Sequence, residues 1–191
     1  MKLINIDQKQ GRKNEFKLFE PSEGITIYIE KISQRHSLYV FGAGHVARPI
    51  VEIAAMVDFR TAVLDDRDQF ANRTAFPTAD EVIVLKNFDR ALDGLQIIDE
   101  SFVVIVTRGH NFDQRVLEQV LATPAAYIGM IGSRTKVANC FRSLKEKGFD
   151  DDQLARVHAP IGLEIGSETP AEIAVSIVAQ LIQVRSQLGQ S

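Results

Sequence analysis

A glycine-rich turn has the residue types and the spacing that hold a phosphate group. An apolar run from Leu38 to Phe41 leads directly into Gly42, Gly44 and Ala47, and a helical pattern follows. In such a unit the first glycine permits a tight bend, the second lets the backbone approach a pyrophosphate, and a small third residue lets the helix pack closely on the strand. The sequence therefore predicts that phosphates rest on the N-terminus of that helix.

An acidic pair follows at the distance that nucleotide binding requires. A second apolar run ends in Asp65 and Asp66, about 20 residues after the glycine turn, where a carboxylate can read a ribose hydroxyl. We predict that one of the two contacts a bound nucleotide. The alternative is that Asp66 forms a solvated loop with Arg67 and Asp68. His45 begins the helix after the glycine turn, and its backbone amide is a further candidate for the phosphate.

A second strand-to-helix turn combines Thr107, Arg108, Gly109 and His110. Arg108 can hold a phosphate or carboxylate through two hydrogen bonds, and His110 can donate a hydrogen bond or a proton. These groups favour anion binding. The structural alternative is that Gly109 only turns the chain while Asp113 caps the next helix.

A third turn contains Gly132, Ser133 and Arg134 at the expected start of another helix. Ser133 is positioned to cap that helix. Arg134 opposes the helix dipole, which indicates a place for an anion, although a solvated arginine is the alternative. His158 is expected in an ordered loop, with its side chain aimed at the same pocket or at a backbone carbonyl.

The histidines and the cysteine do not form a metal-binding pattern. Three imidazoles, those of His45, His110 and His158, could converge on a metal, but their spacing matches no local ligand motif. We therefore predict neither a metal site nor catalytic residues. Cys140 is the only cysteine, so it cannot form an intrachain disulfide, and we expect it to pack within a helix.

Strand-like and helix-like patterns alternate from Leu38 onward, which positions all of these turns at the ends of strands. This alternation predicts an α/β fold, a Rossmann-like three-layer α/β/α domain with a mainly parallel sheet over residues 37–191. Ligands bind such sheets at the carboxyl ends of the strands. The expected strands are 38–41, 60–64, 81–85, 102–106 and 127–131, and the expected helices cover 45–57, 113–122, 136–147, a short stretch after Asp150, and a long stretch from Pro170.

Residues 1–36 have a different pattern, with two short strand-like runs at 16–19 and 25–29. A lone hairpin is marginally stable, so we expect this N-terminal β segment to pair with the main domain, a partner chain or another part of a longer protein. The composition is that of a globular protein, and the net charge of −3 argues against a nucleic-acid partner. Without a long apolar run or a signal-peptide core, we expect no membrane association and a cytoplasmic location.

Five motifs, in order, resemble the carboxyl-terminal domain of the xanthine dehydrogenase accessory factor (XdhC/CoxI) family. The resemblance covers residues 38–185, and residues 1–36 correspond to a remnant of the family's N-terminal domain. Nine candidate residues fall on these motifs, namely Gly42, Gly44, Asp65, Arg108, His110, Gly132, Ser133, Arg134 and His158. The motifs are FGAGHVA at 41–47, DDR at 65–67, TRGHNFD at 107–113, YIGMIGSR at 127–134 and HAPIGLEIGSETPAEIAVSI at 158–177.

The resemblance implies a protein that binds molybdenum cofactor (molybdopterin), assists its sulfuration and inserts it into a molybdenum hydroxylase such as xanthine dehydrogenase. It implies a maturation chaperone and not a xanthine dehydrogenase, with a cysteine desulfurase and a second copy of the chain as further expected partners. Two alternatives stay open on the residues alone. One is an NAD(P)-dependent oxidoreductase, and the other is a nucleotide-sensing module that docks through the N-terminal hairpin.

Overall fold

The computed structural model describes residues 3–4, 16–22, 25–30 and 35–188, and the chain divides into two compact units, 1–34 and 35–191. The first unit contains an antiparallel sheet in the order β1-β2-β3. The two strand-like runs of this region lie within β2 and β3, whose register shifts between Phe19 and Ser22. The bounds are β1 Leu3–Ile4, β2 Phe16–Ser22 and β3 Ile25–Glu30.

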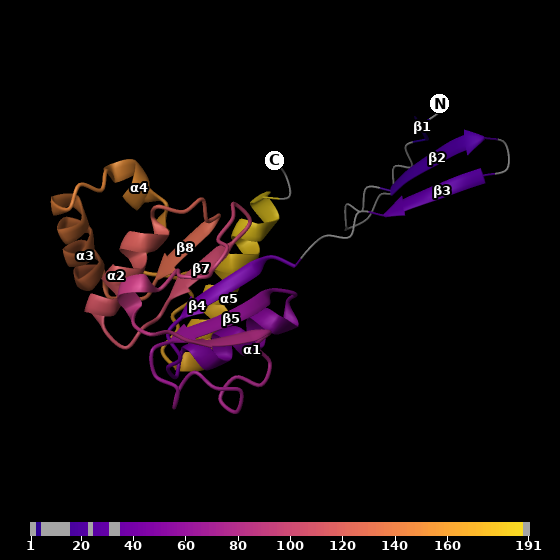
Figure 1. Ribbon diagram of the computed structural model, residues 1–191. Coiled ribbons are helices and arrows are strands. Elements are labelled where there is room, and N and C mark those ends of the chain that lie inside the picture. Colours follow the sequence, from indigo (N-terminus) through magenta and orange to yellow (C-terminus); the bar gives the residue numbers. More distant parts are fainter. Residues whose placement is uncertain (1–2, 5–15, 23–24, 31–34, 189–191) are drawn as a thin grey trace. The chain divides into compact units, whose positions relative to one another are not determined.

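The second unit is built on a six-stranded parallel sheet in the order β6-β5-β4-β7-β8-β9 (Figure 1). All five expected strands are present. Every residue of β7 and β8 is buried because helices cover both faces of the sheet, which explains their continuous apolar runs. The bounds are β4 Ser37–Phe41, β5 Arg60–Asp65, β6 Glu81–Val84, β7 Phe102–Ile105, β8 Tyr127–Met130 and β9 Val157–His158.

Strand β9 corrects one expectation, because His158 was expected to lie in a loop. Its strand has only two residues, and it pairs with β8 through Ile128 and Gly129. A two-residue strand is too short for a hydrophobic period to form, so the sequence pattern could not reveal it.

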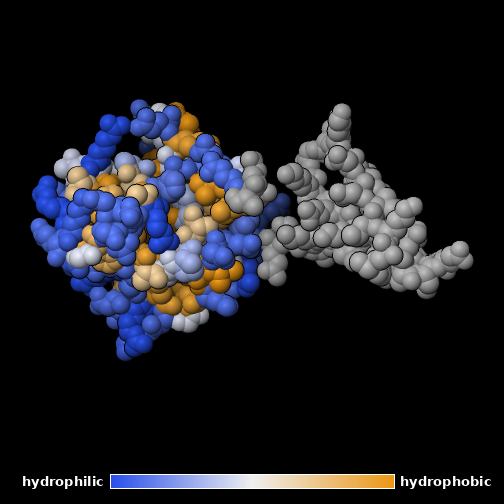
Figure 2. All heavy atoms as spheres, turned by 90° about the horizontal axis from the view of Figure 1, so that it is seen from above, coloured by the Kyte–Doolittle hydropathy of each residue, from blue (hydrophilic) through white to orange (hydrophobic). Residues whose placement is uncertain are grey.

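Helices cover the two faces of the sheet in different groups. One core contains Leu38 and Val63 from the sheet, together with Ile50 of α1 and Ile177 of α5. The opposite core joins the sheet to α2, α3 and α4. On the face shown in Figure 2, hydrophilic residues (blue) cover most of this unit and apolar residues (orange) lie between them in small groups. The bounds are α1 Ala47–Met56, η1 Phe88–Arg90, α2 His110–Val120, α3 Arg134–Glu146, α4 Asp151–Ala155 and α5 Pro170–Leu188.

Capping residues account for where three of these helices begin. Ser133 caps α3, with its Oγ accepting a hydrogen bond from the backbone N–H of Lys136 at 3.3 Å, as the sequence predicted. Asp150 and Gln153 form a capping box at α4. At α5, the Oε2 of Glu172 accepts a hydrogen bond from the backbone N–H of Thr169 at 2.9 Å.

Candidate functional site

Gly42 holds the first turn at the point where β4 meets β7. Its φ of +114° lies in the region that favours glycine, and an added Cβ would lie 2.3 Å from the carbonyl oxygen of Val106. Its backbone N–H donates a hydrogen bond to the carbonyl of Leu64 at 2.7 Å. The tight bend expected here is therefore required by contacts with neighbouring strands.

Gly44 faces open space. An added Cβ would have no neighbouring atom within 4 Å, so packing does not demand a glycine. The space belongs to a cavity of about 570 Å³, which we call the glycine-turn cavity. At its edge α1 begins after Val46 without a side-chain cap, and the Ala47 N–H donates a hydrogen bond to the Gly44 carbonyl at 3.1 Å. The cavity is lined by Ala43, Gly44, His45, Arg48, Gln69, Phe70, Ala75 and Pro170.

Asp65 lies beneath the glycine turn and is fully buried. Its Oδ2 accepts hydrogen bonds from the Ala43 N–H and from Nη2 of Arg67, both at 2.9 Å. Its Oδ1 accepts from the Arg67 N–H at 3.1 Å and from Arg67 Nε at 2.8 Å. Burial alone raises the pKa of Asp65, but the hydrogen bonds from Arg67 and Ala43 outweigh it and hold that pKa below its ordinary value.

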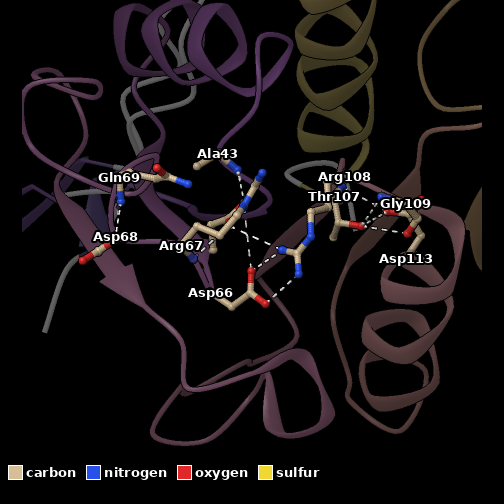
Figure 3. A network of polar contacts seen from close by, with 10 residues as sticks. Ala43, Asp66, Arg67, Asp68, Gln69, Thr107, Arg108, Gly109 and Asp113 are labelled. Carbon is tan, nitrogen blue, oxygen red and sulfur yellow. Dashed lines mark hydrogen bonds and ion pairs between the residues drawn. The ribbon is translucent and has the colours of Figure 1, made fainter.

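Asp66 pairs with Arg108 (Figure 3), and the two acids and two arginines lie in one cluster, because Arg108 Nη1 is also 3.9 Å from Asp65 Oδ1. The two side chains form a two-pronged ion pair, with Nη2 of Arg108 2.9 Å from Oδ2 of Asp66 and a second, shorter contact between Nη1 and Oδ1. The guanidinium carbon of Arg108 also lies 4.1 Å from the ring centre of Phe112. Arg108, which the sequence predicted to bind a phosphate or carboxylate, thus links the ends of β5 and β7.

The turn after β7 is held by its own side chains. Asp113 is buried, and its Oδ1 accepts hydrogen bonds from the Thr107 N–H at 3.0 Å and the Thr107 Oγ1–H at 2.6 Å. The expectation that Asp113 caps the next helix is wrong. Helix α2 begins three residues earlier at His110, with Gly109 as its N-cap, so Asp113 lies in the first turn. Burial raises the pKa of Asp113 to about 6, although the Thr107 hydrogen bonds oppose this.

A second cavity, of about 250 Å³, opens beside that turn. Cys140 lies at its wall in α3, half-buried as expected of a packing residue, and burial raises the pKa of its thiol to about 11. The thiol therefore stays protonated at neutral pH. This cavity is lined by Thr107, Arg108, Gly109, His110, Asp113, Met130, Ile131, Gly132, Lys136, Val137 and Cys140.

The remaining candidates lie apart from these cavities. Arg134 is highly exposed and forms an ion pair with Glu164 at 2.9 Å. The ring of His158 stacks on that of Tyr127, with 4.7 Å between ring centres, and burial lowers the pKa of His158. Tertiary structure thus divides the candidate residues, with Gly44 and His45 at one cavity and the Thr107–His110 turn with Gly132 at the other.

Two exposed cations at the cavities were missed by the sequence reasoning. Arg48 lies in the first turn of α1 and lines the glycine-turn cavity, and Lys136 lines the second cavity from the first turn of α3. The argument used for Arg134, that a cation in a first turn opposes the helix dipole, would have found both. Phe70, also missed, lies in an irregular segment where no period marks it.

Within residues 3–4, 16–22, 25–30 and 35–188, no group of three or more histidine, cysteine, aspartate or glutamate side chains is arranged to hold a metal ion. Among the helices described, none is both long enough and apolar enough to cross a membrane.

The turns described above lie within a region that matches a known protein family. Residues 38–181 match the model of the XdhC Rossmann domain. The chain belongs to this family. The match includes the glycine turn, the acidic pair and the turns after β7 and β8, so the resemblance seen in the five motifs is confirmed.

Two curated bacterial proteins are relatives of this XdhC-family chain. It is 37% identical over 162 residues to the uncharacterized protein YqeB of Escherichia coli K12, covering 85% of this chain and 30% of that protein. It is 31% identical over 163 residues to a Bacillus subtilis protein named as a probable xanthine dehydrogenase subunit, covering 85% of this chain and 47% of that one. The chain therefore spans less than half the length of either relative.

A solved structure agrees. A crystal structure of a xanthine dehydrogenase from Bacillus halodurans matches with a TM-score of 0.71 and 29% sequence identity. The match covers 90% of this chain and 56% of that one, so the shared architecture extends over most of the residues present here.

Proposed function

We propose that this XdhC-family chain is an accessory protein for molybdenum hydroxylases of the xanthine dehydrogenase type. In this proposal it binds molybdenum cofactor in the glycine-turn cavity and assists its sulfuration and insertion into the client enzyme. Family membership supports the association, because one curated relative and one structural neighbour are named for xanthine dehydrogenase.

The single observation that carries ligand binding is the open space at Gly44. The cavity there lies against the start of α1, which has no side-chain cap, so the partial positive charge of the helix N-terminus favours an anion in it. No acidic residue lies in the first turn of α1. The site therefore has positive potential without an anion of its own.

The residues present fit a phosphorylated pterin. The backbone amide of His45 and the guanidinium of Arg48 would hold the phosphate, and the imidazole of His45 would donate a further hydrogen bond. Phe70, 37% exposed at the cavity wall, offers apolar ring surface to a ring system, with the Arg67 guanidinium over one face of its ring. The bound cofactor supplies the redox chemistry of the client, whereas this chain's side chains bind, orient and shelter it.

The proposal is tested by purifying the chain under reducing conditions from cells that make molybdenum cofactor. We expect the chain to retain a fluorescent pterin and to capture a molybdenum hydroxylase in a pull-down, which would also report a cysteine desulfurase. Gly44→Val, which places a branched side chain in the open space of the cavity, should lose the pterin while keeping the wild-type melting temperature. Ala122→Val adds methyl groups at an exposed helix end and is the matched control. A wild-type chain that never retains pterin would overturn the proposal.

A further inference from the structure

Asp65, the acid at the position that binds a ribose hydroxyl in nucleotide-binding turns, has no hydrogen-bond acceptor position left. An ionised carboxylate offers about four lone-pair positions, and Asp65 accepts four hydrogen bonds, one from Ala43 and three from Arg67. Asp65 is also fully buried. A ribose hydroxyl could be bound by this carboxylate only if Arg67 moved away.

Arg67 is held in place from its other side as well. Its guanidinium carbon lies 4.0 Å from the ring centre of Phe70, one of the residues lining the glycine-turn cavity. Its pKa is raised by the hydrogen bond to Asp65, so the guanidinium is charged at neutral pH. Arg67 therefore covers both Asp65 oxygens with a cation that also lies against Phe70, although Arg67 does not itself line the cavity.

The second acid is also committed. Asp66 makes a two-pronged ion pair with Arg108, whose guanidinium stacks on Phe112. Each carboxylate of the acidic pair is thus neutralised by an arginine of this chain, and the dinucleotide that a Rossmann turn normally implies does not fit the acid position.

We infer that Arg67 determines the specificity of the glycine-turn cavity by occupying the ribose-reading carboxylate of Asp65. The cavity then selects a phosphate monoester of a ring compound, the simple form of a phosphorylated pterin, over adenine dinucleotides such as NAD. This inference rests on the proposed function, since it takes the glycine-turn cavity as the ligand site.

The experiment is a calorimetric titration of NAD into the full chain and three variants. Wild type should bind NAD with a Kd above about 1 mM, and Arg67→Ala, which frees Asp65, should bind it at least about tenfold more tightly. Arg67→Lys keeps a cation beside Asp65 and should stay close to wild type. Arg60→Ala, which breaks an exposed ion pair with Glu81 at the other end of β5, is the matched control and should not gain affinity.

A second ligand shows whether any gain in NAD affinity in Arg67→Ala comes from a hydrogen bond between Asp65 and the ribose. NAD that lacks the 2′ hydroxyl on its adenosine ribose should not show the gain in Arg67→Ala, because the freed carboxylate would have lost a donor. Micromolar NAD binding by the wild type overturns the inference even if Arg67→Ala fails to fold, as does an equal gain for both ligands. Either result leaves pterin retention untouched, so failure of this inference is distinguishable from failure of the proposed function.

Discussion

The turns after β4 and β7 follow neighbouring strands, but the helices that they lead into have opposite charges in their first turns. Helix α2 has its own carboxylate, because Asp113 lies buried in its first turn. Helix α1 has no acid in its first turn and has Arg48 there instead. An anion near a helix N-terminus stabilises the helix. Helix α2 has such an anion within its own sequence, whereas α1 would gain this stabilisation only from a bound anion.

The same contrast appears in the two buried acids. Asp65 and Asp113 are both removed from water, but Asp65 has the Arg67 cation as its partner and Asp113 has the Thr107 hydroxyl and amide. The pKa is lowered in Asp65 and raised to about 6 in Asp113. The Arg67 cation outweighs the burial of Asp65, whereas the neutral donors of Thr107 offset the burial of Asp113 only in part.

The largest effect is expected from the two glycines of the first turn. Gly42→Ala should lower the free energy of unfolding by about 3 kcal/mol or more, because the new Cβ meets the Val106 carbonyl and the backbone is strained. Gly44→Ala should change it by less than about 1 kcal/mol, since its Cβ enters open space, yet it should weaken ligand binding. Urea titration and pterin retention measure the two effects. Equal destabilisation by both variants would mean that the Gly44 cavity is filled by the chain.

The next effect concerns pH and the carboxylate of Asp113. Its pKa is about 6 in the folded protein against 3.8 in the unfolded chain, so the folded state keeps a proton that the unfolded chain has already lost. The contribution of Asp113 to the free energy of unfolding should therefore fall as pH rises from about 4 to about 6, by about 2–3 kcal/mol. Asp113→Asn should remove that fall and raise stability at pH 7.

Asp93→Asn, at an exposed acid paired with Arg90, serves as the control for this pH profile and should keep the wild-type slope. Asp65 contributes the opposite dependence. Its lowered pKa means that its stabilisation is lost only as pH falls below about 4. Denaturant midpoints measured from pH 3 to pH 8 check both signs, and a difference between wild type and Asp113→Asn that does not change between pH 4 and pH 6 would contradict the assignment to Asp113.

A smaller effect is expected on pterin affinity when the cation at each cavity is removed, and it shows which cavity holds the phosphate. Arg48→Ala should weaken binding of molybdopterin about tenfold, the value of one charge-assisted hydrogen bond to a phosphate. Lys136→Ala, at the second cavity, should change the affinity by less than about twofold. Fluorescence titration of the pterin measures both variants. The reverse order would place the phosphate at the turn after β7.

The smallest effect is expected at Arg134. Its ion pair with Glu164 is 85% and 90% exposed on its two sides, so solvent screens it. Arg134→Ala should leave the melting temperature within about 1 °C of wild type and pterin retention unchanged. A loss of pterin in this variant would restore the anion-binding role that the sequence predicted for Arg134.

The sequence determined the five longer strands of the parallel sheet and the caps of α3 and α4 because these are local properties. Strands buried on both faces must be apolar along their length, as β7 and β8 are, and a capping side chain bonds to an amide only three residues away. Strand β9 left no such trace. The glycine turn was also readable, since a tight bend followed by a helix is encoded within a few residues.

Only the tertiary structure decided how the candidate site is divided. Asp66 and Arg108 are 42 residues apart and form a pair because the strand order brings β5, β4 and β7 together. Asp65 lies at the spacing expected of an acid that binds a ribose hydroxyl, but in the folded chain its oxygens accept hydrogen bonds from Arg67 and the Ala43 amide. Residue spacing specifies which groups reach the edge of the sheet, whereas packing and charge at that edge specify which of them remain for a ligand.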